Sequence, residues 1–212
     1  MSFTFTLGKS RLGQGVMLAG IAQLCAATAA LAHPGHPGGE PVVAGFAGGF
    51  AHPFGGFDHL MAMLAVGLWA VQYAARADKT AALWLLPASF VAAMAGGFAL
   101  GLAGLALPGV EAGIALSVLL LGLIVAFAVR PPLPVALAVA ALFAVFHGHA
   151  HATELGDASQ AISYAAGMVL ATALLHGFGL AAARLAQQFA LPALTRAAGV
   201  AVALAGVVIL VG

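Results

Sequence analysis

The chain has 212 residues, of which 63% are hydrophobic and only 6% are charged, and its mean hydropathy is +1.10. Soluble domains have about 25% charged residues, so this composition excludes an ordinary soluble domain and predicts a polytopic membrane protein. The formal net charge is only +1. Once the apolar spans are assigned, too few residues remain for a second, soluble domain.

The N-terminal segment has the features of a cleavable secretory signal. Lys9 and Arg11 precede an apolar run over residues 16–31, and small residues end the segment at Ala32. We predict that residues 1–32 form a signal peptide and that residues 33–212 form a single transmembrane helical domain. An additional span that is not cleaved is the alternative.

The only cysteine, Cys25, lies in this predicted leader. The mature chain would then contain no disulfide, and a metal site would have to use His, Asp, Glu, Met or backbone oxygen. Without Lys9 and Arg11, five basic residues stand against six acidic ones. No basic patch for nucleic acid remains, so nucleic acid is excluded as a partner.

Six apolar segments are each long enough to cross a bilayer, which takes about 20 residues. They cover residues 57–75, 81–105, 110–129, 132–152, 160–183 and 193–211. The glycine-rich stretch before them, residues 41–51, is too short to span alone and is expected to form a half-helix or re-entrant lead-in. The expected fold is therefore an all-α bundle with about six transmembrane spans.

The basic residues beyond the leader fall on alternate connections between these spans: Arg76, Lys79, Arg130, Arg184 and Arg196. Because positive residues concentrate on cytoplasmic loops, these connections are predicted to be cytoplasmic. The mature N-terminus would then be periplasmic, with the bundle in a bacterial inner membrane. Three aromatic residues near the inner boundary, Trp69, Tyr73 and Trp84, suggest an aromatic belt.

Metal-seeking side chains stand at the start of the first span. His52 is followed by Pro53 and by the pair Gly55-Gly56, and then by Asp58 and His59. Proline and glycine predict a break in the helix just before the aspartate, and broken helices at membrane depth often line ion sites. The alternative is that Asp58 only caps the restarted helix. That alternative leaves the two histidines unexplained, so we predict a cation site.

A second group of such side chains ends the fourth span. His147, His151 and Glu154 are spaced i, i+4 and i+7, which places them on one helix face, whereas His149 points away. The predicted topology brings this group to the same membrane face as the first. Together the two groups offer nitrogen and oxygen ligands that suit Ni, Co, Zn or Cu better than Mg or Ca.

A histidine deep in the fifth span extends this set toward the cytoplasm. His176 follows Thr172 by four residues, and a buried ionisable residue in a membrane is a functional-site hypothesis by default. Conduction needs several individually weak sites rather than one tight cage. The candidate metal positions are His33, His36, His52, Asp58, His59, His147, His151, Glu154 and His176.

These motifs resemble the HupE/UreJ family of membrane proteins. The resemblance rests on the run His52-Pro53-Phe54-Gly55-Gly56-Phe57-Asp58-His59, on Phe146-His147-Gly148-His149-Ala150-His151 with Glu154, and on Ala171-Thr172-Ala173-Leu174-Leu175-His176-Gly177. It implies transport of nickel or cobalt for hydrogenase or urease, whose maturation proteins would be partners. It also implies no enzymatic activity and no prosthetic group. The family pattern has glycine where this chain has Ala152.

Two other functions use similar residues. Histidines and carboxylates near a membrane surface could hold zinc in an intramembrane hydrolase, although the chain lacks the His-Glu-x-x-His motif. His59 and a histidine of the fourth span could instead be axial ligands of a haem. A metal sensor would need a soluble output domain, which the composition excludes.

Overall fold

The structure is a computed structural model that describes residues 45–75, 80–155 and 158–212. The predicted signal peptide and the tail histidines His33 and His36 lie outside these residues. All regular elements of the described part are helical, which confirms the all-α prediction. They are α2 (Gly45–Gly55), α3 (Phe57–Ala74), α4 (Ala82–Leu102), α5 (Val110–Phe127), α6 (Leu133–Thr153), the short 3-10 helix η1 (Ala158–Gln160), α7 (Ala161–Gln188) and α8 (Pro192–Val211).

Five of the described helices are long and apolar enough to cross a membrane, and the bent pair formed by α2 and α3 supplies a sixth if it counts as one span. Each begins and ends within a few residues of a predicted span, except that α7 continues to Gln188. Large apolar side chains such as Ile162, Phe127 and Val211 are at least two-thirds exposed. Such a surface fits contact with lipid.

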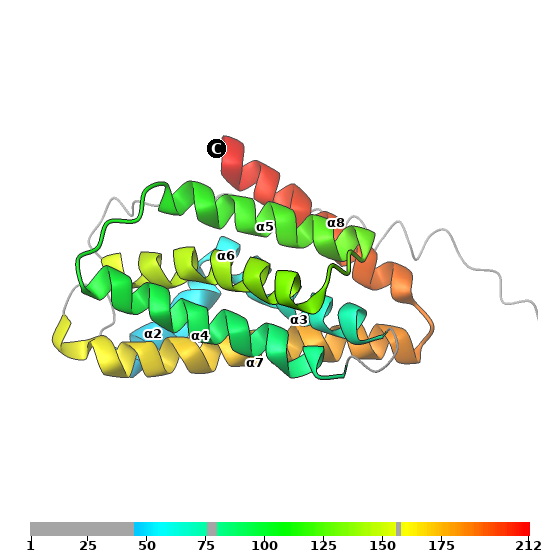
Figure 1. Ribbon diagram of the computed structural model, residues 1–212, viewed down its shortest axis with the longest axis horizontal. Coiled ribbons are helices and arrows are strands. Elements are labelled where there is room, and N and C mark those ends of the chain that lie inside the picture. Colours follow the sequence, from blue (N-terminus) through cyan, green and yellow to red (C-terminus); the bar gives the residue numbers. More distant parts are fainter. Residues whose placement is uncertain (1–44, 76–79, 156–157) are drawn as a thin grey trace, which may run out of the picture.

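Helix α3 occupies the centre of the bundle. It contacts α2, α4, α5, α7 and α8, and the stretch Ala62–Tyr73 is buried except for Leu64. Figure 1 shows α5 and α8 along one side of the bundle and α4 and α7 along the other. A helix that is apolar on all sides is expected at such a buried position.

The predicted aromatic belt is wrong for two of its three residues. Trp69 and Tyr73 are fully buried, and their polar atoms donate hydrogen bonds to the carbonyls of Val129 (2.9 Å) and Pro131 (2.6 Å). Buried tryptophan and tyrosine need such partners for their polar tips. These two side chains therefore tie the end of α3 to the α5–α6 connection, and only Trp84, 71% exposed, faces outward.

The helix break lies at Gly56. There the backbone is extended, with φ −89° and ψ 112°, and α2 and α3 meet at 81°. Pro53 remains inside the last turn of α2 rather than ending it. Helix α2 packs on α7 through Gly49, where a Cβ would overlap the Tyr164 carbonyl. The predicted half-helix before the first span is confirmed, and its packing places His52 against α7.

Helices α4 and α6 form the most extensive contact in the bundle. Their backbones approach closely because Gly97 and Gly148 lack side chains, and a Cβ at Gly148 would overlap the Met94 carbonyl. Small residues allow this close approach between membrane helices. The contact fixes the rotation of α6, so that His147 and His151 face α3 and not lipid.

The described charged residues divide between the two ends of the bundle. Asp58 and Glu111 stand in the first turns of α3 and α5, and Glu154 caps the end of α6. Arg130, Arg184 and Arg196 lie at the opposite ends of the neighbouring helices. One end is therefore acidic and rich in histidine, whereas the other is basic.

Candidate metal site

Four histidine rings form a continuous row at the acidic end of the bundle. The ring centroids of His52 and His151 are 4.7 Å apart, those of His151 and His59 are 4.5 Å apart, and those of His59 and His147 are 4.6 Å apart. They come from α2, α3 and α6. His52 is partly exposed, whereas the other three are buried. The row therefore leads from the surface into the bundle.

Asp58 fixes the ring of its neighbour His59. The carboxylate oxygen Oδ1 accepts a hydrogen bond from Nδ1 of that ring at 2.7 Å and another from the His59 backbone N–H at 2.7 Å. An ionised carboxylate can only accept, so a proton is on Nδ1, and in the neutral ring the lone pair is on Nε2. Carboxylates commonly orient metal-binding histidines in this way. The same oxygen also satisfies an N-terminal N–H of α3.

Ser117 does the same for His147. Its hydroxyl donates to the Ile114 carbonyl at 2.7 Å, which leaves the oxygen to accept from His147 Nε2 at 2.8 Å. The proton of this ring is therefore on Nε2, and the lone pair is on Nδ1. Both buried rings thus have a fixed tautomer with one nitrogen left to bind a cation.

The remaining ring nitrogens have no partner. His59 Nε2, His147 Nδ1 and both nitrogens of His151 are buried and lack any hydrogen-bond partner within the described residues. Leaving a buried polar group unpaired costs about 1–3 kcal/mol. Several such nitrogens in one row are hard to reconcile with a purely structural role. Their lone pairs could coordinate a metal cation that binds imidazole nitrogen.

The outer end of the row has the donors of a metal site. His52, His151 and Glu154 each offer one ligand atom, and these three atoms lie within 4.8 Å of one another. His52 Nε2 and Glu154 Oε2 are 2.9 Å apart. Helices α2 and α6 both end here, and the C-terminal end of a helix favours a cation. Two helix ends and a carboxylate thus make this position attractive to positive charge.

The other two histidines of the described chain lie apart from the row. His149 points away, as predicted, and its Nε2 donates to the Leu105 carbonyl at 2.8 Å. His176 is buried in α7, and neither ring nitrogen has a described partner. The Phe90 ring lies beside His147 at the end of the row and beside His176, with ring centroids 5.8 Å and 5.2 Å away. His176 is thus a second position deeper in the bundle and not a member of the outer group.

Comparison with known proteins identifies the family. A family model described as HupE / UreJ protein matches residues 21–209. This chain belongs to the HupE/UreJ family. Protein HupE of Rhizobium leguminosarum bv. viciae is 49% identical over 164 residues, which cover 77% of this chain and 83% of that protein. No solved structure matches the chain.

The structure adds three residues to the site of this HupE/UreJ protein that sequence reasoning did not select. Ser117 is the only hydroxyl-bearing residue of α5, and Phe90 is one of many apolar residues in α4. Glu111 is close enough to Asp58 and His59 to interact with their charges. Of the three, only Glu111 could have been selected from the sequence, because it is an acidic residue at the same predicted membrane face as the histidines. A lone serine in a span usually bonds its own helix, so its contact with His147 could not be read from the chain.

Proposed function

We propose that the protein carries a divalent transition-metal cation, nickel or cobalt, across the bacterial inner membrane into the cytoplasm. The observation that carries this proposal is the row of imidazoles from His52 to His147, whose buried nitrogens lack partners. The family, to which the chain belongs, is associated with nickel and cobalt transport for hydrogenase and urease. Proteins that insert the metal into those enzymes would receive it.

The spacing of the row suits stepwise movement. Each histidine offers one or two nitrogens, and adjacent ring centroids are less than 5 Å apart. A cation can then be passed between partly formed sites, each weak enough to release it. Imidazole and carboxylate ligands suit nickel and cobalt, whereas magnesium and calcium prefer oxygen alone. Asp58, Glu111 and Glu154 offset the charge of the ion at the entrance.

The cation would enter at the acidic end and leave toward the basic end. Histidines on the segment before α2, His33 and His36, would gather the ion if the leader ends at Ala32. Phe90 would then form an apolar constriction between His147 and His176. The cation could pass Phe90 only if the ring moved, so the parts of the path on either side of Phe90 need not be open at the same time.

The test is a flux measurement with the purified protein in proteoliposomes. Radiolabelled nickel should accumulate inside, and non-radioactive cobalt should compete, whereas magnesium should not. Protons compete with metals for imidazole nitrogen, so binding should weaken as the pH falls. Repeating the flux with and without a pH gradient shows whether protons are coupled to transport. Failure of nickel to enter above the level of empty liposomes would refute the proposal.

One observation favours a second function. Two histidines and a glutamate with an open position, the donors of the group at His52, also form catalytic zinc sites. An intramembrane zinc hydrolase would retain one zinc per chain after treatment with a chelator and would turn over a peptide or lipid. The deeper nitrogens of His59, His147 and His176 have no role in such an enzyme, so transport accounts for more of the structure.

A further inference from the structure

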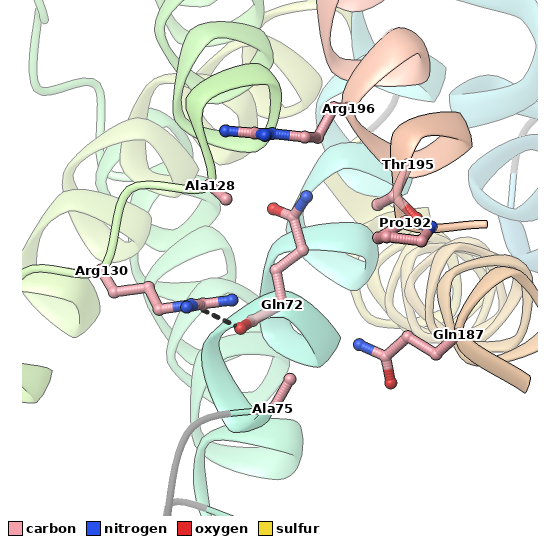
Figure 2. Close-up of a pocket in the computed structure, with 8 residues that line it drawn as sticks. All are labelled: Gln72, Ala75, Ala128, Arg130, Gln187, Pro192, Thr195 and Arg196. Carbon is pink, nitrogen blue, oxygen red and sulfur yellow. Dashed lines mark hydrogen bonds between the residues drawn. The ribbon is translucent and has the colours of Figure 1, made fainter. Parts of the chain in front are cut away.

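The basic end of the bundle contains a cavity that lies outside the histidine row. Its volume is about 470 Å³, and Gln72, Arg130, Gln187, Thr195 and Arg196 contribute to its wall. This size falls within the usual range for small-molecule sites, roughly 300–1,000 Å³. Figure 2 shows Arg130 and Gln187 reaching into the cavity from opposite sides, with Arg196 crossing above Gln72. Two guanidinium groups make it unfavourable to a cation, so it is not suited to be the metal exit.

Both arginines are positioned but not neutralised. Arg130 Nε donates to the backbone carbonyl of Gln72 at 2.7 Å, and Arg196 Nε donates to the backbone carbonyl of Ala126 at 3.1 Å. Within the described residues, no carboxylate pairs with either side chain. The terminal nitrogens of each fork therefore remain to bind an oxyanion such as a phosphate, which arginine binds well. Helix α8 begins at the same cavity with Pro192, and its N-terminal end also favours an anion.

A buried side chain indicates that the anion carries a hydrogen-bond donor as well. Gln72 is 93% buried, and its amide nitrogen donates to the Val125 carbonyl at 3.0 Å. Its Oε1 atom has no partner within the described residues. An amide oxygen can only accept. A hydroxyl on the ligand would satisfy it.

An apolar groove continues from the cavity. The groove has a volume of about 310 Å³, and Thr195 contributes to both hollows. Leu68, Ala182 and Ala198 line the inner part of the groove, closer to the membrane centre than the polar cavity residues of the same helices. Phe189, Leu191 and Leu194 line its outer part, beside the α7–α8 connection. The groove therefore runs beside the charged cavity, from the end of the bundle toward the bilayer core. That is the path of an acyl chain attached to a headgroup in the cavity.

We propose that the cavity and the groove together bind one anionic phospholipid with a hydroxylated headgroup, of the phosphatidylglycerol type. The phosphate contacts Arg130 and Arg196, a headgroup hydroxyl donates to Gln72 Oε1, and an acyl chain lies in the groove between α7 and α8. Basic pockets between membrane helices on the cytoplasmic side are known to hold such headgroups. This site is independent of the metal row at the other end of the bundle.

The test is lipid binding to the purified full-length protein in detergent, followed by native mass spectrometry. Phosphatidylglycerol should bind more tightly than phosphatidylcholine with the same acyl chains. Replacing both arginines by glutamine (R130Q with R196Q) should weaken phosphatidylglycerol about tenfold to thirtyfold, from the usual contribution of two basic residues at a lipid surface. Phosphatidylcholine should be unaffected. Arg184→Gln is the matched control, because Arg184 lies at the same end but lines neither hollow.

Two further arms separate the lipid from other ligands and from a loss of folding. Ala182→Phe fills the groove and should weaken phosphatidylglycerol without changing the binding of soluble glycerol 3-phosphate. If R130Q with R196Q lowers the thermal unfolding temperature, the pair Arg130→Lys and Arg196→Lys keeps the charge and should retain the lipid preference. Equal binding of the two lipids, or equal loss with Arg184→Gln, would overturn the proposal. Tight glycerol 3-phosphate binding with no effect of Ala182→Phe would show a soluble-anion site instead.

Discussion

Single hydrogen bonds decide which nitrogen two of the buried histidines, His59 and His147, present. In His59 the acceptor is the Asp58 carboxylate, and in His147 it is the Ser117 hydroxyl. The two rings are on different helices and use opposite nitrogens, yet both leave one lone pair in the row. Asp58 was predicted as a metal position, and that remains a prediction; in the structure its carboxylate orients the ring of His59.

Asp58→Ala should weaken nickel binding about tenfold to a hundredfold, which is the usual loss when the partner of a metal-binding histidine is removed. The His59 ring loses the acceptor that fixes its tautomer, and the first turn of α3 loses the acceptor of the His59 backbone N–H, so thermal unfolding is measured beside binding. Equilibrium binding to the purified protein and uptake per amount of protein measure the effect. His149→Ala is the control and should be mild, since His149 lies outside the row. Equal damage from His149→Ala and His151→Ala would contradict this placement.

Ser117→Ala should reduce nickel affinity by about tenfold, because His147 loses the acceptor that holds its proton on Nε2. The abundance of the protein should change little, since alanine fits the space of serine. Ser89→Ala is a matched control, because its hydroxyl bonds only the Leu86 carbonyl of its own helix. Isothermal titration of both variants compares the two losses. Indistinguishable affinities would remove Ser117 from the site.

At the scale of elements, the break between α2 and α3 brings His52 of α2 close to His59 of α3. A straight helix would carry His52 away from His59, whereas the 81° bend leaves their ring centroids 5.8 Å apart. The close packing of α2 on α7 and of α6 on α4 then holds His52 beside His151. The site thus depends on two helix contacts made through glycine and on the helix break at Gly56.

Gly56→Ala should lower nickel affinity severalfold with little change in thermal stability. A Cβ at this position would lie 2.9 Å from Asp58 Oδ1 and 3.0 Å from His59 Nδ1, so the hydrogen-bonded pair would have to shift. Gly55→Ala is the control, because a Cβ there meets no atom within 4 Å. Nickel binding and thermal unfolding, measured on both variants, distinguish local displacement from general destabilisation. An equal effect of the two substitutions would count against this geometry.

At the scale of the whole molecule, the charged residues of the described chain are divided by sign between the two ends of the bundle. Acids and the histidine row occupy one end, and the arginines occupy the other. Positive residues are retained in the cytoplasm, so the metal row is expected to face the periplasm. This arrangement sets the direction in which a cation would first meet the protein.

Cysteine labelling can test this orientation. Leu105, 57% exposed, lies at the acidic end, and Arg184 lies at the basic end. In a chain with Cys25→Ser, Leu105→Cys should react with a membrane-impermeant maleimide added to spheroplasts. Arg184→Cys should react only after the membrane is made permeable. The reverse pattern would place the histidine row in the cytoplasm and would exclude uptake by the proposed route.

Much of the fold followed from local properties of the sequence. Hydropathy predicted the spans to within a few residues, except that α7 continues to Gln188, because the length of an apolar run is set by bilayer thickness. The helical period correctly grouped His147 with His151 and set His149 apart. The choice of Asp58, His59 and Glu154 as neighbours of these histidines depended on topology alone, since the start of α3 and the end of α6 lie at the same end of the bundle.

The tertiary structure decided which side chains meet where neighbouring helices pack against each other. Hydropathy placed Trp69 and Tyr73 at a lipid boundary, but their partners are carbonyls about 60 residues away in the chain, so both are buried. The Ser117 contact with His147 and the position of Phe90 before His176 arise in the same way. In short, the sequence determined which segments cross the membrane and which end carries the imidazoles. Only packing between helices determined the tautomer of His147, the order of the row and the contact of Phe90 with both His147 and His176, because rotation about a helix axis is not encoded by hydropathy when nearly every face is apolar.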